Sequence, residues 1–287
     1  MLRGPLRSIR DRIQSFDEWP AWFAVAVSWM RFFGFNLGEA MPDENTIRHF
    51  RNRMIETGTL KRVMKAFDWQ LHKKGYIPMS GEIVDATLVP APKQRNTEGE
   101  KAAIKDGKTA EEIWPDKPAK AAQKDTDARW TLKIGGKIRY KPNGTPLPQI
   151  ALSVFGYKSH ISIDRKFGFI RQATVTSAAD ADGRQLRYVI DKQNTASDVW
   201  ADSAYRSQSN EKWLASNMLT SRIHRRKPGG RPMPEATSRS NAKKSSIRAR
   251  IEHVFAHQKH RFGNHPLFKG FDNWTSRSLL PLHSQFL

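Results

Sequence analysis

The spacing of apolar residues between positions 42 and 75 predicts two consecutive helices. Apolar side chains recur there every three or four positions, as they do along one face of a helix. They are Ile47, Phe50, Met54 and Ile55 and, after the break Thr57-Gly58-Thr59, Leu60, Val63, Met64, Phe67 and Leu71. Asp43 can cap the first helix, and Gly75 can end the second. Such a pair could be a DNA-reading helix-turn-helix or a plain packed hairpin, and the pattern does not decide between them.

From residue 81 onward, short apolar runs bounded by polar residues predict strands that later alternate with helices. Strands are expected at 81–89, 149–163, 167–176, 197–204 and 219–224, with a hairpin at 130–140 around Gly135-Gly136. Helices are expected at 182–192, 211–217 and 241–262. This order predicts an α/β fold, in which helices flank a mixed sheet and a small helical region at 42–75 precedes it.

Three segments follow neither spacing. Residues 91–127 hold eight Lys or Arg and eight Asp or Glu, so we expect a charge-balanced, mobile surface insertion within a domain that covers 81–263. Residues 1–41 begin with several arginines and continue into a Trp- and Phe-rich run without a clear period, which makes them an atypical N-terminal segment. Residues 264–287 are interrupted by proline and glycine and form an atypical C-terminal tail.

The net charge of +21 on 287 residues points to a polyanionic partner, of which nucleic acid is the commonest. A basic surface without a dedicated partner, or one that binds an anionic membrane, would carry the same charge. The chain has no cysteine, which excludes disulfides and cysteine-based zinc motifs and fits a reducing cytoplasm. The most apolar stretch, 19–30, is too short to span a bilayer, which takes about 20 residues. We therefore expect a cytoplasmic protein without a membrane partner.

Positive charge is concentrated between residues 221 and 250, where ten Lys or Arg accompany a single acid, Glu235. This block is the best candidate for contacts to DNA phosphates, and it includes Arg225, Arg226 and Lys227. A solvated basic loop is the alternative interpretation. The position of the block just before a helix that carries a candidate acid favours DNA.

Two aspartates lie inside apolar strands. Asp85 follows Ile83-Val84, and Asp202 follows Val199-Trp200-Ala201. A carboxylate in such a strand costs free energy unless it is paired or bound to a metal. Each aspartate taken alone could equally be a strand-end cap, a salt-bridge partner or a metal ligand.

A third carboxylate, Glu252, lies on the expected helix 241–262. The apolar stripe of that helix consists of Ile247, Ile251, Val254, Phe255 and Phe262. Ser245, Arg248 and Lys259 fall within roughly 40° of Glu252 around the helix axis. Glu252 is thus flanked by two cations and a hydroxyl, although an ordinary solvated face with an Arg–Glu pair would look similar.

Five motifs together resemble those of bacterial insertion-sequence transposases of the Asp-Asp-Glu class, in the group related to insertion sequence five. They are PDENTIRHFRNRM (42–54), IVDATLV (83–89), FGYKSHISID (155–164), VWADSAYRS (199–207) and IRARIEHVFAHQKHRFG (247–263). The late motif of that family is Tyr, two residues, Arg, three residues, Glu, six residues, Lys. Arg248, Glu252 and Lys259 match it in type and spacing, whereas Ser245 stands at the tyrosine position.

The resemblance implies a ribonuclease-H-like fold in which Asp85, Asp202 and Glu252 converge to bind two Mg²⁺ or Mn²⁺ ions. Carboxylate oxygens suit these ions, and two ions about 3.5–4 Å apart can activate an attacking oxygen and stabilise a leaving one. The implied activity is DNA strand cleavage and strand transfer. The implied partners are the terminal inverted repeats and the target, both double-stranded DNA, so the protein would be associated with the nucleoid; a homodimer is left open.

The same resemblance implies roles for the residues around the three acids. Arg248 and Lys259 would hold DNA phosphates or DNA ends. Tyr205 and Arg206, beside the second aspartate, and Ser245, on the helix of Glu252, would support the acids from behind.

Histidines offer two competing readings. His253, His257 and His260 have a spacing that zinc could use, but no HExxH pattern or cysteine accompanies them, and a basic patch facing DNA is the better interpretation. His160 could contact substrate, although a structural histidine explains it better.

Both ends of the chain depart from the family pattern. Members of the family continue past the glutamate helix with another long amphipathic helix, which the tail 264–287 does not match. We therefore expect weak or no transposition from this chain. The alternative function is a catalytically inactive, DNA-binding remnant of a transposase.

Overall fold

The computed structural model describes residues 30–31, 34–36, 39, 42–76, 80–134, 142–143, 151–192 and 198–262. The chain divides into two compact units, Met1–Val63 and Met64–Leu287. Most of the atypical segment 1–41 and the whole tail 264–287 lie outside the described residues.

Two helices occupy the region 42–75, as predicted. They are α3 (Glu44–Glu56) and α4 (Thr59–Lys73), and α4 crosses from the first unit into the second. Asp43 caps α3, because its Oδ1 accepts a hydrogen bond from the backbone N–H of Thr46 at 2.7 Å. Gly58 separates the helices and Gly75 follows α4, both with positive φ angles of 64° and 74°. A role of these helices in reading DNA stays a prediction.

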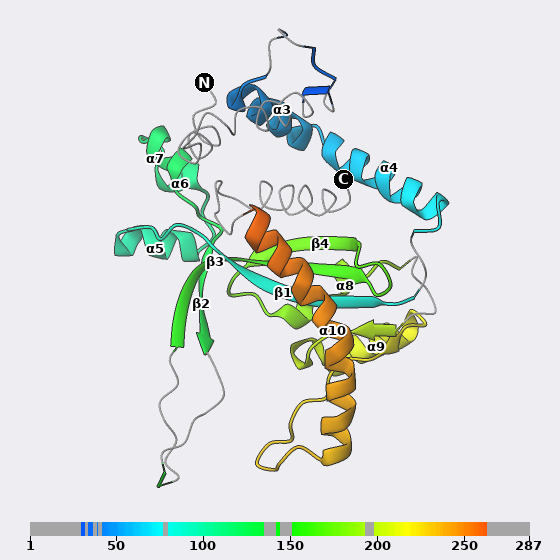
Figure 1. Ribbon diagram of the computed structural model, residues 1–287. Helices are drawn as coiled ribbons and strands as arrows, with labels where there is room; N and C mark the ends of the chain where they lie inside the picture. The colour runs from blue at the N-terminus through cyan, green and yellow to red at the C-terminus, as the bar shows by residue number, and fades with distance from the viewer. Residues whose placement is uncertain are drawn as a thin grey trace, which may run out of the picture. The chain divides into compact units, whose positions relative to one another are not determined.

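In the described part of the second unit, six strands form one mixed sheet (Figure 1). The strands are β1 (Glu82–Pro90), β2 (Arg129–Ile134), β3 (Ala151–Asp164), β4 (Ile170–Ser177), β5 (Asp198–Trp200) and β6 (Thr220–Ser221). Their order is β2-β3-β1-β5-β6, and β4 pairs with the second half of β3. β1 is antiparallel to β3 and parallel to β5, and β5 is parallel to β6. Each predicted strand is present, although β5 and β6 are shorter than expected.

Helices cover both faces of the sheet, and a separate core fills each layer. On one face, α10 (Glu235–Phe262) packs across β1 and β5 (Figure 1). The residues buried in this layer include Ile83, Ile161, Trp200, Ile251, Val254 and Phe255. The other face is covered by η2 (Asp182–Gln185), α8 (Leu186–Val189) and α9 (Gln208–Ser216), and its core includes Val84, Leu186, Val199 and Leu214. This arrangement confirms the predicted α/β class with a mixed sheet and flanking helices.

The apolar stripe of α10 is confirmed, but the helix begins earlier than predicted. Ile251, Val254 and Phe255 are buried and Ile247 is packed against them, whereas the side chain of Phe262 lies outside the described residues. We expected the helix to begin at residue 241, and α10 already begins at Glu235. Residues 235–240 contain no large apolar side chain, so hydrophobic spacing could not reveal this first part of the helix; an exposed ion pair at 3.0 Å joins Glu235 to Arg239.

The charged insertion 91–127 is folded, which corrects the expectation of a mobile segment. It forms α5 (Glu98–Lys105), α6 (Ala110–Ile113) and α7 (Pro118–Gln123). Thr97 and Thr109 cap the first two helices in reciprocal capping boxes with Glu100 and Glu112. The three helices bury a small core of Ala110, Trp114 and Ala121. Sparse apolar residues thus suffice here, because the caps satisfy the helix ends.

The hairpin predicted at 130–140 is described only in its first arm. β2 pairs with the beginning of β3, where Ile134 lies opposite Ala151 and Arg129 opposite Gly156. The predicted second arm, 137–140, lies outside the described residues.

Candidate active site

The register between β1 and β5 directs Asp85 and Asp202 to the same face of the sheet. Ile83 of β1 is paired with Trp200 of β5, and both side chains are buried beneath α10. Side chains alternate between the two faces of a strand, so the residues two positions further on share that face. Those residues are Asp85 and Asp202, and the backbone at Asp202 is still extended, with φ −75° and ψ 175°. The two aspartates are therefore brought together at the ends of neighbouring parallel segments.

Gly81 allows this register. Its φ of 99° lies in a region that residues with a Cβ rarely adopt, and a Cβ built there would come within 2.5 Å of the Asp198 backbone oxygen and of the Trp200 ring. Only glycine lets the start of β1 approach β5 so closely.

Glu252 reaches the same face from α10. Its neighbour Ile251 is fully buried in the core, while the Glu252 side chain is 62% exposed. Arg248 lies one helical turn earlier, and its side chain is only 20% exposed. α10 therefore presents one carboxylate, Glu252, and one cation, Arg248, to the aspartates of the strands.

Arg248 joins two of the three acids. Its Nη1 donates to Oδ2 of Asp85 at 2.6 Å, and its Nη2 donates to Oε1 of Glu252 at 3.2 Å. The Nε atom of Arg248 is buried without a hydrogen-bond partner in the described structure. The expected Arg–Glu pair is thus present, and Asp85 is a further partner.

Burial and negative charge together raise the pKa of Asp85. Loss of hydration is the main cause and outweighs the Arg248 guanidinium and the backbone N–H of Ala86, which both lower the pKa. The negative charges of Asp202 and Glu252 raise it further, to about 6. The charges of Asp202 and Glu252 thus act on Asp85.

Tyr205 lies behind the two aspartates. Asp202 begins the short helix η3 (Ser203–Tyr205), where its Oδ1 accepts a hydrogen bond from the N–H of Ala204 at 2.8 Å. The Tyr205 side chain is 1% exposed, and its hydroxyl has no hydrogen-bond partner among the described residues. Burial, followed by the charges of Asp85, Asp182 and Asp202, holds its pKa well above 10.0. Tyr205 is therefore neutral and packed close to the acids.

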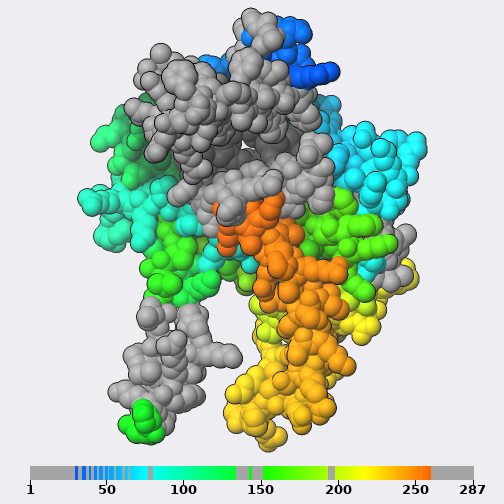
Figure 2. All heavy atoms as spheres, in the orientation of Figure 1, coloured from blue at the N-terminus to red at the C-terminus, as the bar shows by residue number. Residues whose placement is uncertain are grey.

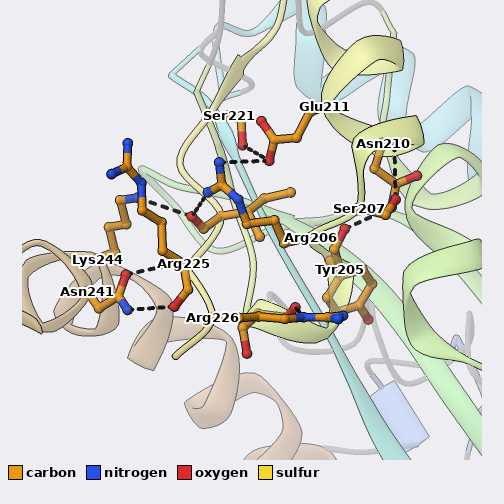
Figure 3. Close-up of polar contacts among 12 residues, drawn as sticks. Tyr205, Arg206, Ser207, Asn210, Glu211, Ser221, Arg225, Arg226, Asn241 and Lys244 are labelled. Atoms are coloured by element: carbon orange, nitrogen blue, oxygen red, sulfur yellow. Dashed lines mark hydrogen bonds and ion pairs between the residues drawn. The ribbon is translucent and has the colours of Figure 1, made fainter. Parts of the chain in front are cut away.

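A network of hydrogen bonds holds the turn that follows Asp202 (Figure 3). The buried amide of Asn210 donates to the backbone oxygens of Gly183 and Tyr205, each at 2.8 Å. A Cβ at Gly183 would come within 2.8 Å of the Ala204 oxygen, so glycine is needed there. Arg206 donates from Nη1 to the Ile223 oxygen at 3.0 Å and ties the turn to the segment after β6. Sequence reasoning missed Asn210 and Gly183, since a single polar or glycine residue carries no spacing signal.

The three predicted phosphate-binding residues of the loop after β6 have different surroundings (Figure 3). Arg225 is held through its backbone, whose N–H and oxygen bond to the Asn241 side chain at 3.1 and 3.0 Å. Arg226 donates from Nε to the Ser203 oxygen at 2.8 Å, so it supports the turn beside Asp202. Lys227 is exposed. In Figure 2 this loop and the first half of α10 form an exposed projection on the face shown.

Lys259 and Ser245 lie on α10 on either side of the acid–base pair. Lys259 is partly desolvated, and burial followed by the charge of Lys133 lowers its pKa. Ser245 lies 3.5 Å from Nε2 of His224. Sequence reasoning missed His224, whose pKa is lowered by burial and, next, by the charge of Arg248.

His160 has the surroundings of a structural histidine. It is fully buried on β3, its Nε2 lies 2.9 Å from Oγ1 of Thr176, and burial lowers its pKa to about 4. His253 and His257 are separate from it and line a surface pocket of about 450 Å³ with Lys166, Phe167, Gly168, Arg250 and Val254. The side chain of His260 lies outside the described residues, so the proposed zinc spacing is not tested.

The chemistry of the three acids fits a divalent cation. Within the described ranges, no three His, Cys, Asp or Glu side chains are close enough to hold a metal ion together. However, Asp85, Asp202 and Glu252 supply the oxygen donors that Mg²⁺ and Mn²⁺ prefer. The raised pKa of Asp85 reflects negative charge crowded into a poorly hydrated place, which a cation would relieve. The guanidinium of Arg248 already supplies part of the positive charge that such a cation would bring.

Comparison with known families identifies one domain. Residues 78–273, more than half of the chain, match the family model described as a transposase DDE domain. The match includes all three acids, α10 and the basic block 221–250. It does not test the narrower group related to insertion sequence five. None of the described helices is long and apolar enough to cross a membrane.

Proposed function

We propose that this chain, which belongs to the transposase DDE domain family and is therefore a transposase, cuts and transfers DNA strands with Asp85, Asp202 and Glu252 as its metal-binding catalytic acids. One observation supports this proposal above the others. Two strand aspartates lie on the face of the sheet that α10 covers, Arg248 of α10 joins Asp85 to Glu252, and the charges of Asp202 and Glu252 add to the burial that raises the pKa of Asp85. The fold is the ribonuclease-H-like type that the sequence predicts.

In the proposed mechanism Asp85, Asp202 and Glu252 would hold two Mg²⁺ or Mn²⁺ ions. These ions would neutralise the charge on the phosphate and activate the attacking oxygen. In the first step water attacks the phosphodiester at an end of the element, the bond to the 3′ oxygen breaks, and a free 3′-hydroxyl remains. In the second step that hydroxyl attacks a phosphodiester of the target DNA, the bond from that phosphorus to the 3′ oxygen of the target strand breaks, and a new strand junction forms while the target strand keeps a free 3′-hydroxyl. The chain contributes positioning, which matters more than covalent chemistry in phosphoryl transfer.

The basic residues around the acids have proposed roles in holding DNA. Arg248, which contacts Asp85 in the structure, would be free to hold a DNA phosphate once a cation took over Asp85. Lys259 holds a second phosphate further along α10. Ser245, at the tyrosine position of the late motif, supports this face together with His224. Tyr205 and Arg206 position the turn of Asp202 from behind.

The proposed substrates are the terminal inverted repeats and a target site, both in double-stranded DNA of the nucleoid in the cytoplasm. Pairing of two element ends would be served by a homodimer, which we leave as part of the proposal. The inactive, DNA-binding remnant is the less favoured alternative, because all three acids are present and the charges of Asp202 and Glu252 both act on Asp85.

The experiment that tests the proposal follows a labelled duplex that carries one end of the element. The wild-type chain should release a 3′-hydroxyl end in Mg²⁺ or Mn²⁺ and join it to a second duplex, at the low rate expected from its atypical tail 264–287, whereas a chelator should stop both steps and leave DNA binding intact. Binding without cleavage in either cation would favour the inactive remnant instead.

A further inference from the structure

Two cations converge on one backbone carbonyl beside the proposed active site. Arg206 donates from Nη1 to the Ile223 oxygen at 3.0 Å, and Lys244 of α10 donates from Nζ to the same oxygen at 3.1 Å. Figure 3 shows both side chains approaching this oxygen from opposite sides of the loop. A single carbonyl carries only a partial negative charge, so it does not neutralise two cations.

A third cation is fixed next to them. The side chain of Asn241 bonds to both the N–H and the oxygen of Arg225, at 3.1 and 3.0 Å, and so attaches this part of the loop to α10. Asn241 precedes Lys244 by three residues, so the two lie on neighbouring positions of the helix surface. The Arg225 side chain is exposed and extends beside Lys244 (Figure 3).

Acids balance only part of the positive charge in this cluster. Arg222 pairs with Asp198 at 3.0 Å, and Arg206 makes a long pair with Glu211 at 3.5 Å. Neither Arg225 nor Lys244 forms an ion pair with a carboxylate in the described structure. Burial lowers the pKa of Lys244, and the charges of Arg206, Arg225 and Arg222 lower it further. An added anion would therefore be stabilised here.

We propose that Arg206, Arg225 and Lys244 form a subsite for one phosphodiester group of the DNA strand that passes through the active site. This inference rests on the proposed function, because it takes the anion to be DNA. The subsite differs from the contact assigned to Arg248, which faces Asp85 and Glu252.

The place of the subsite fits a strand that leads away from the three acids. Lys244 lies one helical turn before Arg248 and two turns before Glu252 on α10, and Arg206 is four residues after Asp202. His224 lies next to α10 between these two positions, since its Nε2 is 3.5 Å from Oγ of Ser245, the residue that follows Lys244. A strand held at the subsite would thus be aligned with the acids before cleavage.

The test uses the salt dependence of DNA binding, measured by anisotropy of a labelled duplex in the presence of a chelator. The variants are Lys244→Gln, which can still donate to the Ile223 oxygen, Arg225→Gln and the double variant. Lys212→Gln is the matched control, because Lys212 is an exposed lysine on α9 outside the subsite. Thermal unfolding of each variant checks that the fold is kept.

Each single variant should weaken binding. In the double variant the slope of log K against log salt should become less steep by about 0.9, the value for one phosphate. A loss of about 1.8 would mean two separate contacts and would overturn the shared subsite, and so would an unchanged slope or an equal effect of Lys212→Gln. Cleavage of the same duplex by the wild-type chain is measured in parallel, in Mg²⁺. If the slope changes as expected but wild-type protein never cuts DNA, the proposed function fails and the subsite stands.

Discussion

Arg248 and Asp85 lie 163 positions apart in the sequence, and Nη1 of Arg248 donates to Oδ2 of Asp85 at 2.6 Å. Both side chains are largely buried, with 20% and 16% of their surface exposed. Through Nη2 the same guanidinium reaches Glu252 at 3.2 Å. The arginine thus supplies positive charge to two of the acids, as a divalent cation would. Arg248 and the cation should therefore compete for Asp85.

The first prediction follows from this competition. In Arg248→Met, Mn²⁺ should bind without DNA at least about tenfold more tightly, because a hydrogen bond between charged groups worth roughly 1.5–3 kcal/mol no longer has to be broken. Titration followed by electron paramagnetic resonance measures the free Mn²⁺. Arg250→Met is the control, since Arg250 donates to backbone oxygens of Arg165 and Lys166 rather than to an acid. Equal or weaker Mn²⁺ binding in Arg248→Met would refute the competition.

The second prediction concerns pH. Asp85 must be ionised to bind a cation, and its pKa is raised to about 6. Mn²⁺ affinity should therefore fall about tenfold per pH unit below pH 6 and level off above it. Between the ordinary pKa of 3.8 and about 6, the folded state holds a proton on Asp85 that the unfolded state has lost. The free energy of unfolding therefore falls as pH rises through that range, and above it Asp85 causes no further change. A pH-independent affinity between pH 5 and about 6.5 would contradict the raised pKa.

The third prediction separates two neighbouring basic residues. Arg226 donates to the Ser203 oxygen beside Asp202, so Arg226→Met should slow cleavage more than it weakens DNA binding. Lys227 is exposed, so Lys227→Met should weaken binding on all sequences alike, lower the salt slope by about one and leave the cleavage rate at saturating DNA unchanged. Rates and dissociation constants are measured on the same duplex. The opposite order of effects would place the phosphate contact at Arg226.

The fourth prediction concerns the buried hydroxyl of Tyr205. Because that hydroxyl has no hydrogen-bond partner in the described structure, Tyr205→Phe should raise the free energy of unfolding by about 1 kcal/mol. Denaturant titration should show a higher midpoint at an unchanged slope. A loss of stability would mean that the hydroxyl is paired after all, with water or with one of the acids.

Local spacing predicted the parts of the fold that depend on alternating or helical apolar patterns. The buried run Ile83-Val84 marked β1, and the stripe through Ile251 and Phe255 fixed which side of α10 faces the sheet. The Arg248–Glu252 pair follows from their four-residue separation. The contact of Arg248 with Asp85 depends on how α10 crosses β1, and no local pattern contains that crossing.

The spacing of apolar residues did not predict other features, because polar residues determine them. The insertion was expected to be mobile, although Thr97 with Glu100 and Thr109 with Glu112 both have the capping-box spacing that announces a helix start. Lys244 and Asn210 act through single backbone oxygens that only tertiary folding brings near, Ile223 for the lysine and Gly183 for the amide. Such contacts require the assembled turn after Asp202.

The central claim is that Asp85, Asp202 and Glu252 together perform metal-dependent strand cleavage. The most direct measurement is the rate at which Asp85→Asn, Asp202→Asn and Glu252→Gln cut a duplex carrying an element end in Mg²⁺, beside the wild type and Glu111→Gln, a variant of an exposed acid on α6 outside the site. Each of the three variants should keep its DNA affinity and lose cleavage by about a hundredfold or more, while Glu111→Gln keeps cutting. Full cleavage by any one of the three variants, with the wild type active, would remove that residue from the site and contradict the claim.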